Sequence, residues 1–318
     1  MKMNLTEIGF YTLSDERAAQ ATHESPLWRC EILVTKDCNF NCPYCRSIGP
    51  ENALTWEEAK EVLDYWIDEG LKNVRFSGGE PTMWPHLKQA VEYCRDNGVE
   101  RIAVSTNGSA DPYQYAVLLV AGVNDFSISL DACCAEDNKR MTGRNAVFDR
   151  VVRNIKALAA RTYVTVGVVL TEDNMEQLSD IIDYAKSLGV ADVRVIPAAQ
   201  HGAMLEIENT VDMPILDYRY GNSQNGETVR GLRDTDNNRC PLILDDMAVI
   251  GNKHYPCIIY AREGGDEIGT IGESTREDRR KWSESHDVLT DAICSANCLD
   301  VCRDYNNKHK QLNGGCNG

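Results

Sequence analysis

Apolar and polar positions alternate along residues 30–200 in short stretches of two kinds. Stretches of the first kind are rich in β-branched and other apolar residues and are short enough to predict buried strands. They are Cys30–Thr35, Asn73–Ser77, Arg101–Ser105, Asp125–Leu130, Tyr163–Leu170 and Ala191–Pro197. The segments between them carry apolar residues at helical spacing. The chain is therefore expected to alternate between strands and helices.

Two of the predicted helices have clear boundaries. The first begins at Thr55, which forms with Glu58 the T-x-x-E pattern of a capping box. Apolar residues at i, i+3, i+4 and i+7 spacing follow it, from Ala59 to Ile67. The last predicted helix, 178–188, is followed by Gly189, a residue type that commonly ends helices.

Strand–helix repeats predict parallel strands joined by right-handed crossovers. The resulting α/β sheet would form either an open barrel segment or a doubly wound sheet. Both architectures bind ligands at the C-terminal ends of the strands. The loops after the first four strands should therefore line one site. They read CNFNCPYC (38–45), SGGEPTMWP (77–85), STNGS (105–109) and SISLDA (127–132).

Length and charge narrow the class of protein. The chain has 318 residues, enough for one large domain or one domain with an appendage. Its net charge of −16 repels a phosphate backbone, so we expect no nucleic-acid partner. The N-terminus lacks the apolar run of a secretory signal, and no apolar run reaches the ~18 residues of a membrane span. We expect a cytoplasmic protein that does not enter a membrane.

Thirteen cysteines are many for a cytoplasmic chain. Reductants disfavour disulfides there, so clustered thiols indicate metal binding or catalysis. Three lie within residues 38–45, and a second set lies near the C-terminus: Cys240, Cys257, Cys294, Cys298, Cys302 and Cys316. Cys133 and Cys134 follow the fourth strand, where a thiol could donate a hydrogen atom to a substrate radical, although loop thiols without a role are commoner.

These patterns divide the chain into four parts. Residues 1–29 form an N-terminal extension and residues 30–200 form the core. Residues 201–239 are rich in Asn, Gly, Asp and Arg and predict a connector with at most a short helix. Residues 240–318 form a cysteine-rich region, whose last twelve residues, 307–318, look like a frayed tail.

The first cysteine cluster has the spacing C-x3-C-x2-C, at Cys38, Cys42 and Cys45. A closed [4Fe–4S] cluster takes four thiolates. Three would leave one iron with an open position, the general sign of a reactive metal site. The pattern resembles the radical S-adenosylmethionine (SAM) superfamily. The resemblance implies that these cysteines hold a catalytic cluster whose open iron binds the amino and carboxylate groups of SAM.

The resemblance extends to the family's GGEP segment, here Gly78, Gly79, Glu80 and Pro81. Glycines let the backbone approach the methionyl part of SAM closely. Glu80 can accept a hydrogen bond from the SAM ammonium group. A structural zinc site is the alternative, but zinc favours paired C-x2-C knuckles with four ligands and gives no role to GGEP.

Further stretches resemble SAM contacts of the family. Thr106-Asn107-Gly108 and Ser129-Leu130-Asp131 resemble segments that contact the ribose and carboxylate, and Tyr44 lies where relatives contact adenine. The resemblance covers about residues 30–200. It implies the family's usual core, a partial (β/α)6 TIM-like barrel.

The second cysteine set begins with a predicted strand–turn–strand hairpin between Cys240 and Cys257. C-x3-C-x3-C follows at Cys294, Cys298 and Cys302, and the last two would share one face if helical. This arrangement resembles the SPASM or twitch extension of the same superfamily. It implies one auxiliary [4Fe–4S] cluster, with two ligands from the hairpin and two from the distal segment. A zinc ribbon is the alternative.

The resemblance implies an enzyme that cleaves SAM reductively to a 5′-deoxyadenosyl radical, which abstracts a hydrogen atom from a substrate. Such an enzyme needs an external one-electron reductant of the flavodoxin or ferredoxin type. We favour modification of a ribosomally made peptide, by crosslinking or epimerisation. Residues 1–29 are too few for a peptide-recognition domain, but a separate protein could supply one. The alternatives are an enzyme acting on a small molecule, such as an aminocyclitol, sugar or nucleotide, and an iron–sulfur sensor or scaffold.

Overall fold

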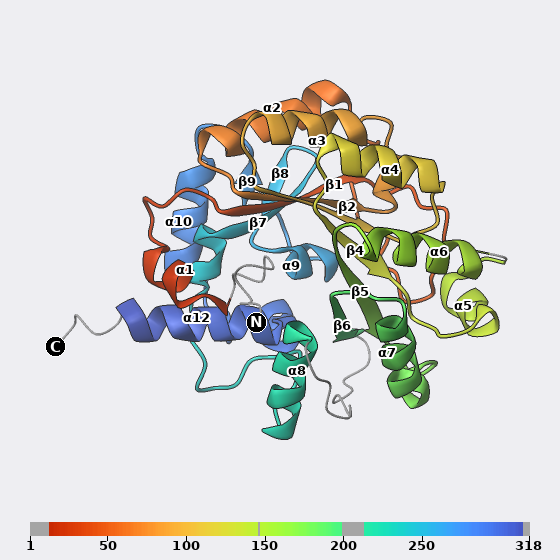
Figure 1. Cartoon of the computed structure of the whole chain (residues 1–318). Helices are drawn as coiled ribbons and strands as arrows, with labels where there is room; N and C mark the ends of the chain where they lie inside the picture. Colours follow the sequence, from red (N-terminus) through yellow and green to blue (C-terminus); the bar gives the residue numbers. More distant parts are fainter. Residues whose placement is uncertain (1–12, 146, 199–212, 314–318) are drawn as a thin grey trace.

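The computed structural model describes residues 13–145, 147–198 and 213–313, and Figure 1 shows the whole chain. The described residues build one nine-stranded sheet with the order β6-β5-β4-β3-β2-β1-β7-β8-β9. The strands are β1 Arg29–Thr35, β2 Asn73–Gly78, β3 Arg101–Thr106, β4 Asp125–Ser129, β5 Tyr163–Leu170, β6 Asp192–Pro197, β7 Asp246–Ile250, β8 Lys253–Tyr255 and β9 Gly269–Thr270. The six predicted strands are confirmed, with ends that shift by one residue at most.

Helices cover the convex face of this sheet, as Figure 1 shows for α2, α3 and α4 above β1 to β4. The helices are α1 Asp15–Gln20, α2 Trp56–Asp68, α3 Leu87–Asp96, α4 Pro112–Ala121, α5 Ala135–Thr142, α6 Phe148–Ala159, α7 Leu178–Ser187, α8 Pro214–Gln224, α9 Ile258–Arg262, α10 Thr275–Ser285, α11 Ala292–Asn297 and α12 Asp300–Asn313. The capping box of α2 is confirmed, because Thr55 Oγ1 accepts from the Glu58 N–H and Glu58 accepts from the Thr55 N–H at 2.8 Å. Gly189 follows α7 with a φ of 80°, as expected after a helix end.

The strand order distinguishes the two architectures that the sequence left open. Strands β1 to β6 are all parallel and neighbour one another in chain order. A doubly wound sheet would reverse its order at a switch point, and this one does not. Strands β6 and β9 end the order without pairing to each other, so the barrel is partial. Apolar strand residues such as Val74 and Phe76 pack against Leu63 and Trp66 of α2, which forms the core between sheet and helices.

The C-terminal segment adds to the same sheet. Strand β7 pairs in parallel with β1, and β8 returns antiparallel to β7. The predicted strand–turn–strand between Cys240 and Cys257 is thereby confirmed, although residues 241–244 form a 3₁₀ helix instead of extending the strand. The short helix expected in the connector is α8.

Two expectations for the last residues are wrong. Helix α12 continues to Asn313, where the sequence predicted a frayed tail from residue 307. It is held by packing on α1, where the fully buried Tyr305 donates from its hydroxyl to the Arg17 carbonyl at 3.3 Å. Cys298 caps the C-terminus of α11 and lies before α12, so Cys298 and Cys302 do not share a helical face.

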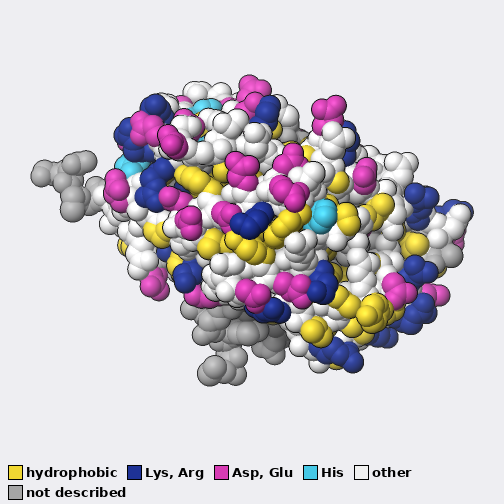
Figure 2. All heavy atoms as spheres, turned by 90° about the horizontal axis from the view of Figure 1, so that it is seen from above, with side chains coloured by type: hydrophobic (Ala, Val, Ile, Leu, Met, Phe, Trp, Pro, Cys, Tyr) yellow, Lys and Arg dark blue, Asp and Glu magenta, His cyan; other side chains and the backbone are white. Residues whose placement is uncertain are grey.

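The outer face above α2 to α4 carries acidic and basic side chains interspersed, with small apolar areas between them (Figure 2). Within the described ranges, every helix is too short or too polar to cross a membrane.

Candidate active site

A cavity of about 290 Å³ opens at the C-terminal ends of the parallel strands. It brings together ten residues that the sequence singled out. They are Cys38, Cys42, Tyr44, Cys45, Gly78, Gly79, Thr106, Asn107, Ser129 and Asp131. Their common position follows from the topology, because the loops after parallel strands emerge at one edge of the sheet. The contacts predicted for each residue with a cluster or SAM remain predictions.

The three-cysteine loop is built to present sulfur to this cavity. Cys38 Sγ accepts from the Phe40 N–H at 3.4 Å and from Asn107 Nδ2 at 3.8 Å. Cys45 Sγ accepts from the Ser47 N–H at 3.3 Å. Such donors are typical around thiolates that ligate metal. Burial raises the pKa of Cys42 to about 12, so its thiolate needs the charge of a bound metal centre. The residues present fit a [4Fe–4S] cluster with three protein ligands.

Gly78 and Gly79 seat this loop on the sheet. Gly78 is the last residue of β2 and has a φ of 127°, and Gly79 follows it. The Gly79 N–H donates to the Thr35 carbonyl at 2.7 Å, and the Glu80 N–H donates to the Asp37 carbonyl at 2.7 Å. These bonds join the chain directly before Cys38 to the GGEP segment. The glycines are therefore required by the close packing of the chain on itself, whatever they contribute to SAM binding.

Glu80 and Pro81 do not line the cavity; they lie buried behind it. The Glu80 carboxylate accepts from the Thr82 N–H at 3.0 Å, from Thr106 Oγ1 at 2.7 Å and from the Asn107 N–H at 2.7 Å. Burial raises the pKa of Glu80, although these hydrogen bonds oppose the shift. Glu80 thus ties the loop after β2 to the loop after β3. Its predicted bond to the SAM ammonium group stays a prediction.

Tyr44 and Asp131 connect the cysteine loop to the far side of the barrel. The Tyr44 hydroxyl donates to Asp131 Oδ2, and Asp131 Oδ1 accepts from the Val169 N–H of β5 at 2.6 Å. Burial raises the pKa of Asp131 to about 6, while the two hydrogen bonds lower it. This pair holds the segment between Cys42 and Cys45 against strands β4 and β5.

The cavity also contains residues that the sequence analysis missed. Four are arginines: Arg46, Arg194, Arg230 and Arg262. Others are serines within strands: Ser77 and Ser105, which are next to last in β2 and β3, and Ser127 in the middle of β4. The sequence did carry a signal for them. In NVRFSG and DFSIS every second residue is polar, and alternate residues of a strand face the same side of the sheet. Cys133 and Cys134 are not among the described residues that line the cavity.

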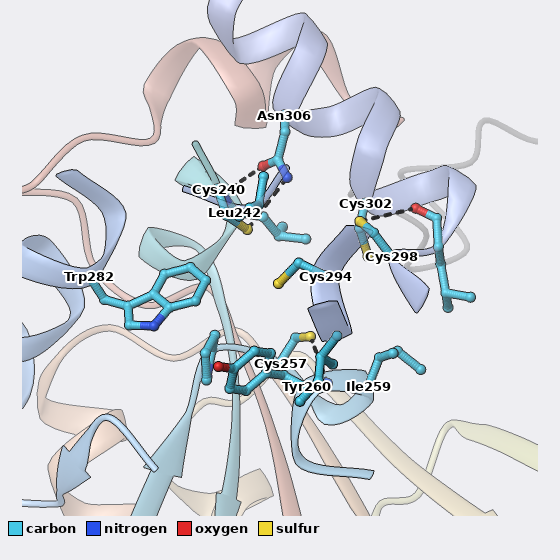
Figure 3. Close-up of a pocket in the computed structure, with 14 residues that line it drawn as sticks. Cys240, Leu242, Cys257, Ile259, Tyr260, Trp282, Cys294, Cys298, Cys302 and Asn306 are labelled. Atoms are coloured by element: carbon cyan, nitrogen blue, oxygen red, sulfur yellow. Dashed lines mark hydrogen bonds between the residues drawn. The ribbon is translucent and has the colours of Figure 1, made fainter. Parts of the chain in front are cut away.

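A second pocket gathers five cysteines of the C-terminal region, and Figure 3 shows them around one space. They are Cys240, Cys257, Cys294, Cys298 and Cys302. They come from several segments. Cys240 precedes the 3₁₀ helix 241–244, Cys257 is the N-cap of α9, Cys294 lies in α11, Cys298 is the C-cap of α11, and Cys302 lies in α12. Cys316 lies outside the described residues. The rest of the lining is largely apolar and includes Leu242, Ile259 and Trp282.

Hydrogen-bond donors face two of these sulfurs. Asn306 Nδ2 donates to Cys240 Sγ at 3.4 Å, and the Tyr260 N–H donates to Cys257 Sγ at 3.4 Å (Figure 3). Burial raises the pKa of Cys298 and Cys302 well above its ordinary value. Buried thiols that converge in an apolar pocket fit an iron–sulfur cluster or another thiolate-bound metal, and five are one more than the four thiolates that a [4Fe–4S] cluster or a tetrahedral zinc takes.

Helix α9 lies on the opposite side of the sheet from α2 to α4 (Figure 1), and its residues contribute to both pockets. Cys257 at its N-cap lines the five-cysteine pocket, and Arg262 at its C-terminus lines the barrel cavity. Ile259 lines both. The two pockets therefore share the side chains of α9 as part of their walls.

Comparison with known proteins agrees with this geometry. Residues 32–185 match the family model described as Radical SAM superfamily. GTP 3′,8-cyclase 1 of Mycobacterium tuberculosis is 30% identical over 213 residues, which are 60% of this chain and 58% of that protein. This chain thus spans less than two thirds of the length of that curated relative.

Two solved structures share the fold over most of the chain. SuiB of Streptococcus suis, bound to precursor peptide SuiA, has a TM-score of 0.59 and 16% identity, covering 82% of this chain and 65% of that chain. Native anSMEcpe with bound AdoMet and Cp18Cys peptide has a TM-score of 0.57 and 16% identity, covering 90% and 95%. Residues 32–185 are therefore a radical SAM domain.

Proposed function

We propose that this protein is an enzyme that cleaves SAM reductively and uses the 5′-deoxyadenosyl radical to abstract a hydrogen atom from a substrate in the barrel cavity. The observation that carries the proposal is the convergence of the Cys38, Cys42 and Cys45 loop with the loops after β2, β3 and β4 on one cavity. A [4Fe–4S] cluster bound by these cysteines supplies the electron for SAM cleavage.

The residues of the chain have separate tasks in this proposal. Cys38, Cys42 and Cys45 bind the cluster. Gly79 and Asn107 present backbone and amide groups to SAM at the cavity wall. Four further residues of the cavity complete the surroundings of SAM: Tyr44, Thr106, Ser129 and Asp131. Glu80 and Pro81 lie behind the cavity, and Glu80 holds two of the loops in register. The barrel excludes bulk water from the radical, which would otherwise be quenched or lost.

We also propose that the five-cysteine pocket holds one auxiliary [4Fe–4S] cluster. Cys240 and Cys257 supply two ligands from the hairpin side, and two of the three distal cysteines supply the others. A cluster there would carry an electron or bind substrate next to the barrel, because α9 connects the two sites. A one-electron reductant of the flavodoxin or ferredoxin type would serve the catalytic cluster.

A peptide is the substrate class that we favour. Two proteins with this fold were crystallised with peptides, and the shared fold includes much of the C-terminal region as well as the barrel. A small anionic molecule is the second candidate. The relative named GTP 3′,8-cyclase and the arginines of the cavity favour it.

The first test compares iron and sulfide content after anaerobic reconstitution of the wild type with that of the Cys38/Cys42/Cys45→Ala triple variant. We expect the variant to keep about half of the iron and to form no 5′-deoxyadenosine from SAM and dithionite. Cys134→Ala is the matched control, because it removes an exposed thiol outside both pockets, and it should behave like wild type.

The outcomes separate the proposals. A triple variant without iron would remove the auxiliary cluster from the proposal, and zinc in the five-cysteine pocket would then be assayed first. A wild type that binds iron and SAM but forms no 5′-deoxyadenosine would indicate a sensor or scaffold. Peptide and small-molecule substrates are distinguished by adding a cell extract that stimulates SAM cleavage. Protease treatment of the extract should abolish the stimulation if the substrate is a peptide, and should leave it unchanged if the substrate is a small molecule.

A further inference from the structure

The barrel interior contains more basic than acidic side chains, although the whole chain is strongly acidic. Among the described residues that line the cavity are four arginines, which are Arg46, Arg194, Arg230 and Arg262, and two carboxylates, which are Asp131 and Glu263. Asp131 accepts from Tyr44, and Glu263 pairs with Arg46 at 2.7 Å. Positive charge is thus concentrated in the cavity of a chain with a net charge of −16.

Arg194 is the cavity arginine whose position has the clearest consequence. It lies in the middle of β6, opposite Gly167 of β5, which adds no side chain beside it. Arg194 Nη2 donates to Ser127 Oγ of β4 at 2.9 Å. Its Nε is buried and has no hydrogen-bond partner among the described residues. A guanidinium carries five N–H donors, so most of its capacity is unused.

The acidic side chains near Arg194 are already engaged. Glu31 pairs with Arg29 at 3.1 Å, and Asp125 pairs with Arg101 at 3.1 Å. Neither forms an ion pair with Arg194 within the part of the chain that the structure describes.

Asp192, two residues earlier on β6, is also engaged. Its carboxylate accepts from the backbone N–H groups of Ile215 and Leu216 at the start of α8, at 2.8 and 3.2 Å. Burial, together with the charges of Arg75 and Arg219, lowers the pKa of Arg194 to about 9, so Arg194 remains a cation at neutral pH.

Arg194 is half-buried, and its buried Nε–H without a partner is costly unless an acceptor or a counter-charge reaches it. The proposed [4Fe–4S] cluster and SAM are two possible sources of this counter-charge. The predicted SAM contacts lie at the C-terminal ends of β2 to β4 and in the loops that follow the strands. Arg194 lies two strands from Ser129 at the same level of the sheet, and its guanidinium reaches Ser127, two residues deeper in β4 than Ser129. Because the guanidinium points to this deeper position, the geometry favours the substrate as the counter-charge, and a measurement of SAM affinity separates it from SAM.

We propose that the barrel cavity binds its substrate through an oxyanion group, a carboxylate or a phosphate, that docks on the Arg194 guanidinium beside the Ser127 hydroxyl. This inference rests on the proposed function, because it takes the cavity as the substrate site. The fork of Arg matches the two oxygens of a carboxylate or phosphate, and Ser127 orients the fork. Arg230, which donates to the Pro197 carbonyl at 2.7 Å, adds positive potential at the cavity wall without being part of the docking pair.

Anion binding to the reconstituted, SAM-bound enzyme tests the proposal without any knowledge of the substrate. Inorganic pyrophosphate and succinate are titrated separately by calorimetry under anaerobic conditions at low ionic strength. We expect the wild type to bind at least one probe, and Arg194→Gln to bind it at least about tenfold more weakly. Arg194→Lys should lose less affinity than Arg194→Gln, since it keeps the charge without the fork. The preferred probe tells whether the natural group is a phosphate or a carboxylate.

Two further variants make the comparison specific. Arg280→Gln removes a surface charge on α10, outside the cavity, and should bind the probe like wild type. Ser127→Ala removes the hydroxyl that orients Arg194 and should weaken binding by about threefold. If Arg194→Gln does not fold, Arg194→Lys and Ser127→Ala still decide the matter.

Three results would overturn the proposal. They are a wild type that binds neither probe, an Arg194→Gln variant that binds the probe as tightly as wild type, and an Arg194→Gln variant whose affinity for SAM itself falls about tenfold. The last result would place Arg194 in the SAM site. Formation of 5′-deoxyadenosine from SAM and dithionite is measured in parallel, so that a failure of the proposed radical chemistry is recognised separately from a failure of anion binding.

Discussion

At the scale of single residues, Gly79 has no room for a side chain. An added Cβ would lie 2.2 Å from the Asp37 carbonyl oxygen and 2.5 Å from the Lys36 carbonyl oxygen. Both neighbours are backbone atoms of the segment that leads to Cys38, so neither can rotate away. The cysteine loop therefore keeps its position only while residue 79 is glycine.

Gly79→Ala should consequently lower the free energy of unfolding by about 2–3 kcal/mol and reduce the iron bound at the catalytic site. Anaerobic urea titration and iron content after reconstitution measure both effects. Gly221→Ala is the matched control, because Gly221 lies in α8 with nothing within 4 Å of an added Cβ. The control should be neutral or stabilised by about 0.5–1 kcal/mol. Equal stability of the two variants would contradict the steric argument.

At the scale of elements, the hairpin β7–β8 with α9 connects the parallel barrel to the five-cysteine pocket. Strand β8 is short, and His254 in its centre is fully buried. Neither ring nitrogen of His254 has a hydrogen-bond partner among the described residues. Burial lowers the pKa of His254 to about 4, with Asp278 of α10 opposing the shift and Arg279 adding to it. The hairpin thus depends on a neutral histidine.

This arrangement predicts a loss of stability in acid. The unfolded chain binds a proton on this histidine near pH 6.5, before the folded chain does. The contribution of neutral His254 to the free energy of unfolding is therefore complete above about pH 6.5. About 2–3 kcal/mol of it is lost as the pH falls toward 4. The free energy of unfolding of His254→Leu should fall less over this range than that of wild type. His23→Gln, which changes a partly exposed histidine, should keep the wild-type dependence because His254 is still present. If the free energy of unfolding of His254→Leu depends on pH in the same way as that of wild type, His254 is not the cause of the acid lability.

At the scale of the molecule, a buried ion pair joins two segments that are far apart in the chain. Arg17 of α1 pairs with Asp245, which directly precedes β7, and the Arg17 guanidinium lies 3.9 Å from the ring centre of Trp28. Helix α12 packs on the same helix α1. Burial raises the pKa of Asp245 to about 6, while Arg17 opposes the shift. The first helix thus closes over the segment that carries the second cysteine set.

Arg17→Met should cost about 3–5 kcal/mol at pH 8, because it leaves the Asp245 carboxylate buried without its counter-ion. The defect should shrink as the pH falls toward 5, since a protonated Asp245 needs no counter-ion. The double variant Arg17→Met/Asp245→Asn should recover much of the loss at pH 8. Urea titrations of the three proteins at both pH values measure this. A double variant no more stable than Arg17→Met would show that the pair does not act as a unit.

Local pattern was sufficient for much of the fold and for the first half of the site. Strand positions, the capping box at Thr55 and the turn after β7 were all predictable, since each depends on neighbours within a few residues. The convergence of Cys38, Gly79, Asn107 and Asp131 at one cavity was also predictable, because parallel strands place their following loops at the same edge. The family resemblance added the expected ligands of that cavity.

The rest depended on contacts between residues far apart in the chain. The sequence placed Cys298 and Cys302 on one face only if their segment were helical. The chain turns between α11 and α12 instead, and both cysteines still line one pocket. The contact of Glu80 with SAM stays a prediction, and the sequence carried no sign of the hydrogen bonds that its oxygens accept from Thr82, Thr106 and Asn107. Arg194 gave no signal beyond one polar position in a strand. Its isolation from the barrel carboxylates appears only when β6 lies beside β5, because charge pairing is decided by three-dimensional distance and not by spacing along the chain.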